Sequence, residues 1–313
     1  MRITWFILLS GFMSLTMAEP AKKLEIQKVT NGIYALVGQR GPMSKWNFGT
    51  NATFGVIITR EGVILIDPGA SYKAAKYIHE AVMTITDSPI VWVIDTGGED
   101  QRWLGNSYFK SLGAHIIASR AAIKYQRENA NDQLIRLDGL ITAALAKGTT
   151  DAYADESFEK EKILTVGGVE IVLKQDGVAY TAGDTYVWLP EKKVVFSGDI
   201  ISVERMLAIA IDSKTESWIK IFKNIENLEP EYIIPGHGHV TNITKARADT
   251  LDYLVLLRQA VKEFISKGGE IEDVSTLNQY PLSPFERLIG YDMLMGRNAL
   301  HVYMDLEWEM PGH

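Results

Sequence analysis

The chain has 313 residues, of which 46% are hydrophobic and 23% are charged, and its formal net charge is −7. This length provides ample core for one large domain or two small ones, and the composition is that of an ordinary globular protein. The negative charge argues against a nucleic-acid groove, which concentrates positive charge to meet phosphates. No glycine-rich phosphate fingerprint with a following acid occurs, which argues against a dinucleotide site.

The N-terminus has the pattern of an export signal. Arg2 precedes an almost entirely apolar run from Ile3 to Met17, and Thr16-Met17-Ala18 offers small residues to a signal peptidase. We therefore predict a signal peptide over residues 1–18, cleavage after Ala18, and a mature periplasmic or secreted domain over 19–313. The apolar run is shorter than the ~20 residues that cross a bilayer, so no membrane span is expected after cleavage; an uncleaved anchor is the alternative. No cysteine occurs, so no disulfide supports the exported chain.

The first half of the chain is predicted to begin with strands and to continue with alternating helices and strands. Asn31-Gly32 is a typical hairpin turn between short alternating runs. Strands are expected over 26–37 (interrupted by this turn), 53–58, 63–66, 90–94 and 114–118. Helices are expected over 71–84, about 101–112 and 120–146, and an irregular loop over 149–156.

The second half repeats this order. Strands are expected over 162–174, 184–189, 193–198 and 232–234, and helices over 215–227 and 243–267. Each half thus has strands with helices outside them, which indicates an α/β fold with two sheets face to face between helical layers. No repeat or linker divides the halves, so we expect one domain with internal pseudo-symmetry.

Four segments carry a resemblance to a known family. They are Val63–Gly69, the strand and motif at 90–106, Phe196-Ser197-Gly198-Asp199, and Ile234-Pro235-Gly236-His237-Gly238. In order and separation they resemble the metallo-β-lactamase superfamily over roughly residues 27–309. The closing segment 297–307 is similar to exported members of a branch associated with sulfur oxidation and quinoprotein dehydrogenases. The resemblance implies a four-layer αβ/βα sandwich with a cleft where the strand-end loops meet.

The resemblance also implies a metal site, which this chain has largely lost. Members of the family hold two zinc or iron ions with a Thr-His-x-His-x-Asp-His signature, a further His, an Asp and a last His, and the metals activate water. Here the signature threonine is Thr96, and the unchanged ligands are Asp199 and His237. The other ligand positions hold Gly97, Glu99, Gln101, Arg102 and Tyr180.

These substitutions leave few donors. One metal would keep Glu99 and Asp199, and the other would keep Asp199 and His237 with Gln101 as a weaker oxygen donor. Arg102 adds a permanent positive charge, which repels a dication. Since zinc generally needs three good protein ligands, we do not expect the standard two-zinc centre.

Two functions remain open. The first is a non-hydrolytic protein whose cleft binds a small anionic or quinone-like ligand, or a periplasmic protein partner, with Arg102 carrying the recognition beside Gln101 and Tyr180. The second is a hydrolase of ester, thioester or lactam bonds. It would use one zinc, iron or manganese ion on Glu99, Asp199 and His237, and Arg102 would steady the oxyanion.

Structural roles are the alternatives for several of these residues. Asp199 is also expected as an ion-pair partner of Arg102 if no metal is bound. Tyr180 either fills the space of the lost histidine or donates a proton. Asp67 is expected to brace the loop before the signature motif.

Overall fold

The computed structural model describes residues 24–276, 282–307 and 309. The predicted signal peptide over 1–18 and its cleavage site therefore lie outside the described residues and stay a prediction. Among the helices of the described part, none is long and apolar enough to cross a membrane.

The first sheet has seven strands in chain order. The Asn31-Gly32 turn is confirmed, because it joins the first two strands and Gly32 has a φ of 75°, in the left-handed region. β1 to β4 are antiparallel neighbours, and β4 to β7 are parallel. The strands are β1 (Glu25–Thr30), β2 (Ile33–Val37), β3 (Thr53–Thr59), β4 (Gly62–Ile66), β5 (Ile90–Asp95), β6 (His115–Ser119) and β7 (Glu156–Phe158).

The second sheet has five strands in the order β12-β11-β10-β9-β8. The predicted strand over 162–174 is a hairpin, because Gly167 and Gly168 both have positive φ and turn the chain. The strands are β8 (Glu161–Val166), β9 (Val169–Lys174), β10 (Tyr186–Leu189), β11 (Val194–Phe196) and β12 (Tyr232–Ile234).

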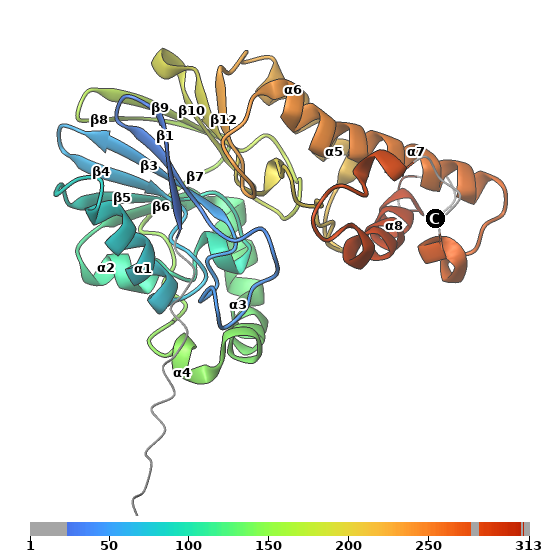
Figure 1. The fold of residues 1–313 in the computed structure, drawn as a ribbon, viewed down its shortest axis with the longest axis horizontal. Coiled ribbons are helices and arrows are strands. Elements are labelled where there is room, and N and C mark those ends of the chain that lie inside the picture. Colours follow the sequence, from blue (N-terminus) through green and yellow to red (C-terminus); the bar gives the residue numbers. More distant parts are fainter. Residues whose placement is uncertain (1–23, 277–281, 308, 310–313) are drawn as a thin grey trace, which may run out of the picture.

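The helices lie outside the two sheets (Figure 1). The predicted helices at 71–84 and 215–227 are confirmed with ends shifted by about one residue. The helices are α1 (Tyr72–Met83), α2 (Asn106–Ser111), α3 (Arg120–Ile141), α4 (Ala143–Ala146), α5 (Thr215–Glu226), α6 (Ile243–Ala246), α7 (Asp252–Ser266) and α8 (Tyr291–Glu307).

The helix predicted over 101–112 is wrong in its first half. The chain forms a short 3-10 turn at Asp100–Arg102 (η1), and α2 begins only at Asn106. Gly105 explains the break: its amide donates to the carbonyl of Gly69, and a Cβ there would lie 2.2 Å from the carbonyl oxygen of Pro68. This close approach holds the signature motif in a loop.

Three other predicted elements differ from the structure. The helix expected over 120–146 is split at Thr142, which has a φ of 83°. The loop expected over 149–156 runs into β7. The helix expected over 243–267 contains a π-helical turn, Arg247–Leu251, between α6 and α7.

The packing forms four layers. One hydrophobic cluster lies between the two sheets, and it includes Ile64 and Ile94 from the first sheet and Leu173 and Phe196 from the second. A second cluster fills the space between the first sheet and α1 and α2, and a third packs α5, α7 and α8 against the second sheet. The predicted four-layer αβ/βα sandwich is confirmed.

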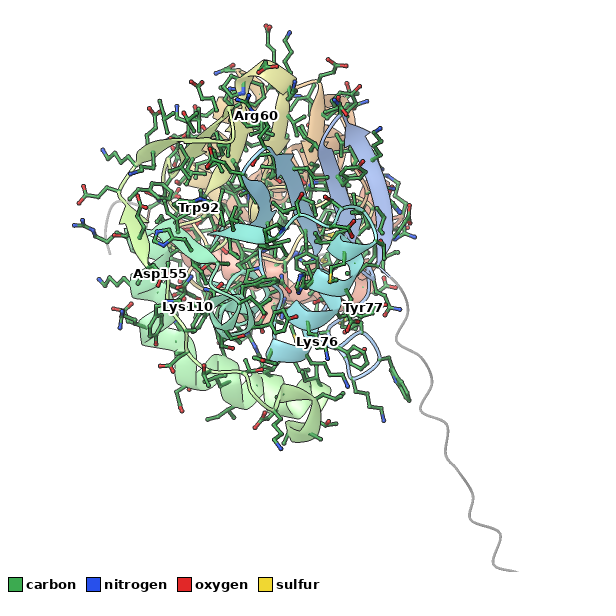
Figure 2. The ribbon with its side chains drawn as sticks, turned by 90° about the vertical axis from the view of Figure 1, so that its left-hand side faces the viewer. Arg60, Lys76, Tyr77, Trp92, Lys110 and Asp155 are labelled. Carbon is green, nitrogen blue, oxygen red and sulfur yellow. The ribbon has the colours of Figure 1, made fainter. Side chains whose placement is uncertain are left out.

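Polar contacts at the outer edge of the first sheet secure α2. Figure 2 shows this side, where Lys110 of α2 and Asp155, just before β7, make an ion pair of 2.5 Å. Trp92 of β5 packs edge-on against His115 of β6, with ring centroids 4.5 Å apart. These contacts hold α2 against the segment before β7, and β5 against β6.

Candidate functional site

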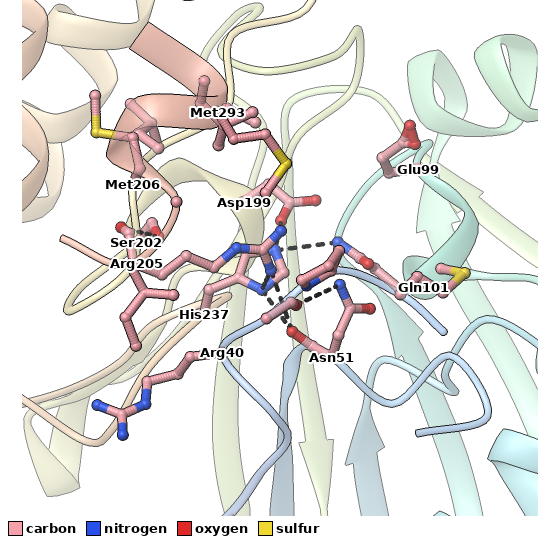
Figure 3. Close-up of a pocket in the computed structure, with 18 of the residues that line it drawn as sticks. Arg40, Asn51, Glu99, Gln101, Asp199, Ser202, Arg205, Met206, His237 and Met293 are labelled. Carbon is pink, nitrogen blue, oxygen red and sulfur yellow. Dashed lines mark hydrogen bonds and ion pairs between the residues drawn. The ribbon is translucent and has the colours of Figure 1, made fainter. Parts of the chain in front are cut away.

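A cavity of about 340 Å³ opens where loops from the two halves meet. Five of the residues predicted for the site line it: Glu99, Gln101, Tyr180, Asp199 and His237. The structure therefore brings these residues to one cavity (Figure 3).

Arg102 lies behind this cavity, at the centre of a buried ionic cluster. Its Nε donates to Asp199 Oδ2 at 2.9 Å and its Nη2 to Asp199 Oδ1 at 2.5 Å. Its Nη1 donates to Asp67 Oδ2 at 2.8 Å, and Nη2 also reaches the carbonyl of Gly236 at 3.2 Å. The side chain is 0% exposed. The prediction that Arg102 recognises a ligand is therefore wrong, because its donors are used by the protein and no part of it reaches the cavity.

The charge of Arg102 and the burial of the cluster set the pKa values of Asp199 and Asp67. Burial acts to raise the pKa of Asp199, but the Arg102 guanidinium outweighs it and holds this pKa well below its usual range. The same cation only partly offsets the burial of Asp67, whose pKa is raised to about 6. Asp67 accepts hydrogen bonds from the amide and the hydroxyl of Thr96, which confirms that it braces the loop before the motif.

His237 lies at the floor of the cavity among donors and acceptors. Its Nε2 lies 3.3 Å from Asp199 Oδ1 and 3.1 Å from Gln101 Nε2. Its Nδ1 lies 2.9 Å from the carbonyl of Asn51 and 2.8 Å from Arg205 Nη1. Burial lowers the pKa of His237 to about 4, with Arg205 acting in the same direction. The imidazole is therefore neutral at neutral pH.

Glu99 is directed away from His237 and is paired with another group (Figure 3). Both its carboxylate oxygens accept from Arg136 Nη2, at 3.0 and 2.9 Å, and the same nitrogen reaches Asp100 at 2.9 Å. Burial and the neighbouring Asp100 raise the pKa of Glu99 to about 7. Glu99 and Asp100 thus form an acid pair closed by one arginine on α3.

Tyr180 contributes a phenol to the cavity wall. Its ring packs 6.1 Å from that of Trp218, and its backbone amide donates to Asp184 Oδ2 at 2.6 Å. Burial raises the pKa of Tyr180 well above its usual value, and Glu99 acts in the same direction. The phenol therefore keeps its proton and can donate a hydrogen bond into the cavity.

The donors present do not fit a metal centre. Within the described ranges, no three histidine or acidic side chains are grouped as a metal ion would require. Asp199 uses both oxygens on Arg102, and Glu99 uses both on Arg136. A side chain at the position of the first lost histidine would also be crowded, because a Cβ on Gly97 would lie 3.0 Å from Asp184 Oδ1.

The cavity also has polar and charged residues that were not predicted from the sequence, among them Asn51, Arg205 and Arg297. Asn51 is buried, and its side-chain oxygen has no hydrogen-bond partner among the described residues. Arg205 follows Asp199 closely in the chain, and this proximity to an unchanged motif residue was the available signal. Arg297 comes from α8, whose position against the cleft no local pattern indicates.

The two facing sheets between helical layers, with the cleft at the strand-end loops, define a metallo-β-lactamase-like fold. A family model described as "Metallo-beta-lactamase superfamily" matches residues 48–237. The chain therefore belongs to the metallo-β-lactamase superfamily.

Relatives with this fold are distant in sequence. The chain is 23% identical over 267 residues to a "Metallo-beta-lactamase type 2" of Elizabethkingia meningoseptica, covering 83% of this chain and 98% of the relative. It is 23% identical over 270 residues to a "Beta-lactamase-like protein 2 homolog" of Caenorhabditis elegans, covering 85% and 79%.

Solved structures agree on the fold. A metallo-beta-lactamase from Pontibacter korlensis superposes with a TM-score of 0.60 at 20% identity, covering 74% of this chain and 99% of that one. The sec-alkylsulfatase Pisa1 from Pseudomonas sp. superposes with a TM-score of 0.70 at 16% identity, covering 90% of this chain and 50% of that one. At these identities the likeness concerns the fold alone.

Proposed function

We propose that this protein is a non-hydrolytic member of the superfamily that binds a small anionic ligand in the cleft. One observation carries the proposal: the fully buried guanidinium of Arg102 bridges Asp67 and Asp199. Because this cation already neutralises the carboxylate that the family uses to bridge two metals, the cluster is complete without a metal ion.

The hydrolytic alternative finds less support. It requires Glu99, Asp199 and His237 on one ion, yet Glu99 is paired with Arg136 and Asp199 with Arg102. A dication would have to displace Arg136 from Glu99 and Arg102 from Asp199, and breaking the second pair, which is buried, leaves an uncompensated charge at a cost of roughly 3–5 kcal/mol.

The proposal includes export. The apolar N-terminal run and Ala18 support a cleaved signal peptide, and the absence of cysteine is compatible with either side of a membrane. A periplasmic or secreted protein would meet its ligand, or a protein partner that delivers the ligand, outside the cytoplasm.

Metal content tests the proposal directly. The untagged protein, recovered after export and again after dialysis against zinc, iron or manganese, is measured by elemental analysis beside a metal-binding member of the family. We expect less than about 0.1 equivalent of each metal and no change in thermal stability on adding a chelator. One tightly held equivalent, together with ester, thioester or lactam turnover that Asp199→Ala abolishes, would instead establish the single-metal hydrolase.

A further inference from the structure

Two arginines of the cavity have no carboxylate partner among the described residues. Four arginines line the cavity, and two of them have carboxylate partners: Arg40 pairs with Glu204, and Arg136 pairs with both Glu99 and Asp100. Arg205 and Arg297 make no ion pair with any residue in the described part of the chain. Since Asp199 is paired with Arg102 and the acid pair Glu99–Asp100 with Arg136, the positive charge without a carboxylate partner in the described ranges is local to Arg205 and Arg297.

Arg205 is the deeper of the two. It is partly buried, and its Nη1 donates to the carbonyl of Asn51 at 3.3 Å and lies 2.8 Å from His237 Nδ1. Burial lowers the pKa of Arg205, Asp199 partly opposes this, and the charges of Arg102 and Arg297 lower it further. A guanidinium that is desolvated, faces like charges and lacks a carboxylate is stabilised by an anion from outside the chain.

The wall beside these arginines is apolar. Met293, Leu294 and Arg297 lie at helical spacing on the face of α8 that lines the cavity. Met206 and Leu207, next in the chain to Arg205, are buried and line the same cavity. The guanidinium groups of Arg205 and Arg297 therefore have apolar side chains as neighbours on the same wall of the cavity. Met293 extends over the cavity (Figure 3).

The mouth of the cavity is also apolar, although it faces water. Met293 is 64% exposed, Ile289 is 44% exposed and Leu140 of α3 is 42% exposed, and all three line the cavity. Large exposed hydrophobic side chains gathered at the rim of one cavity mark a binding surface. They continue the apolar wall from the interior to the surface.

We propose that the cavity binds a single-chain amphiphile, with an anionic head group on Arg205 and Arg297 and an alkyl chain along Met206, Leu207 and Met293. The ligand's head supplies the missing counter-charge and its chain covers the apolar rim. This inference rests on the proposed function, because a metal in the cleft would replace the arginines as the site of the head group.

A chain-length series tests the inference by isothermal titration calorimetry. The purified protein is titrated with acetate, hexanoate, octanoate and decanoate below their micelle-forming concentrations, and with decanol and decyltrimethylammonium as neutral and cationic ligands of equal length. Each buried methylene should tighten binding by about threefold to fourfold. Decanoate should bind at least about tenfold more tightly than decanol or the cation.

Substitutions test the contacts to the ligand's head group and to its alkyl chain separately. Arg297→Gln and Arg205→Gln should each lower the affinity for decanoate by about tenfold and leave the affinity for decanol unchanged. Met293→Gln should reduce the gain per methylene. The matched controls are Arg120→Gln, at an exposed ion pair far from the cavity, and Met83→Gln, at an exposed position on α1. Arg297 is exposed, so its variant tests the charge even if Arg205→Gln impairs folding.

The outcomes distinguish the inference from the proposed function. Equal affinity for decanoate and decanol, affinity that does not rise with chain length, or equal losses in the two controls would overturn the inference. If metal-free protein fails to bind decanoate, the inference falls while the non-hydrolytic function stands. If the protein carries stoichiometric metal, the proposed function falls whatever the titrations give.

Discussion

Replacing Arg102 tests whether the buried cation holds the altered site together. In Arg102→Met the apolar stem is retained, but Asp199 loses both guanidinium contacts and Asp67 loses one. Because removing one partner of a buried pair leaves a charge uncompensated, the free energy of unfolding should fall by roughly 3–5 kcal/mol. Urea unfolding followed by tryptophan fluorescence measures this loss.

The loss should depend on pH in a defined direction. In the wild type the lowered pKa of Asp199 means that its stabilising contribution is complete at neutral pH and is lost only as the pH falls below the usual range of an aspartate. Without Arg102, burial raises the pKa values of Asp199 and Asp67, so stability is lost as the pH rises. The gap between wild type and variant should therefore be larger at about pH 8 than at about pH 5.

Two further variants make this result interpretable. Arg120→Met removes an exposed arginine paired with Glu159 and should change stability little. Adding Asp67→Asn and Asp199→Asn to Arg102→Met removes the uncompensated charges and should restore most of the lost stability. A loss below about 1 kcal/mol, or a loss equal at both pH values, would refute the reasoning that the guanidinium neutralises these carboxylates.

Three other predictions concern the supporting structure. Gly183→Ala should destabilise the protein by roughly 2–5 kcal/mol in urea unfolding, because Gly183 has a φ of 94° and its Cβ would lie 2.1 Å from the amide of Ala122. Gly139→Ala, in open space on α3, should stabilise it by about 0.5–1 kcal/mol in the same assay. Burial raises the pKa of Asp95, whose Oδ2 accepts from Asn106, so its stabilising contribution is present at low pH and lost as the pH rises. Asp95→Asn should therefore gain stability relative to wild type between about pH 5 and pH 8, and thermal melts that move the other way would contradict this assignment.

The strands could be predicted from the sequence because their signals are local. The turn before Gly62 separates the apolar runs of β3 and β4, Asp67-Pro68-Gly69 ends β4, and the glycines of the signature motif follow β5. The break before α2 had no such signal. It results from the approach of Gly105 to the chain at Pro68, and a contact between distant segments leaves no trace in a helical periodicity.

The sequence predicted which residues belong to the site better than it predicted the directions of their side chains. Motif positions indicated that Glu99, Tyr180, Asp199 and His237 meet, and all four line one cavity. The direction of a side chain is decided by which partners are within reach. Arg102 faces two buried carboxylates on the interior side, so it turns away from the cavity into which the motif position alone would place it.

The same reasoning explains why Arg205, which the sequence did not single out, presents to the cavity beside His237 a positive charge that no carboxylate of the described residues pairs. Buried carboxylates require a cation, and Arg102 satisfies Asp67 and Asp199 with directed hydrogen bonds that need no additional ligands. With that charge used internally, the floor of the cavity presents a neutral His237 and the positive Arg205. Under the proposed function, a cleft that holds its cations as arginines would attract an anion by charge and hydrogen bonds without activating a water to attack it. We therefore expect the attraction for negatively charged groups to persist where metal-dependent catalysis does not.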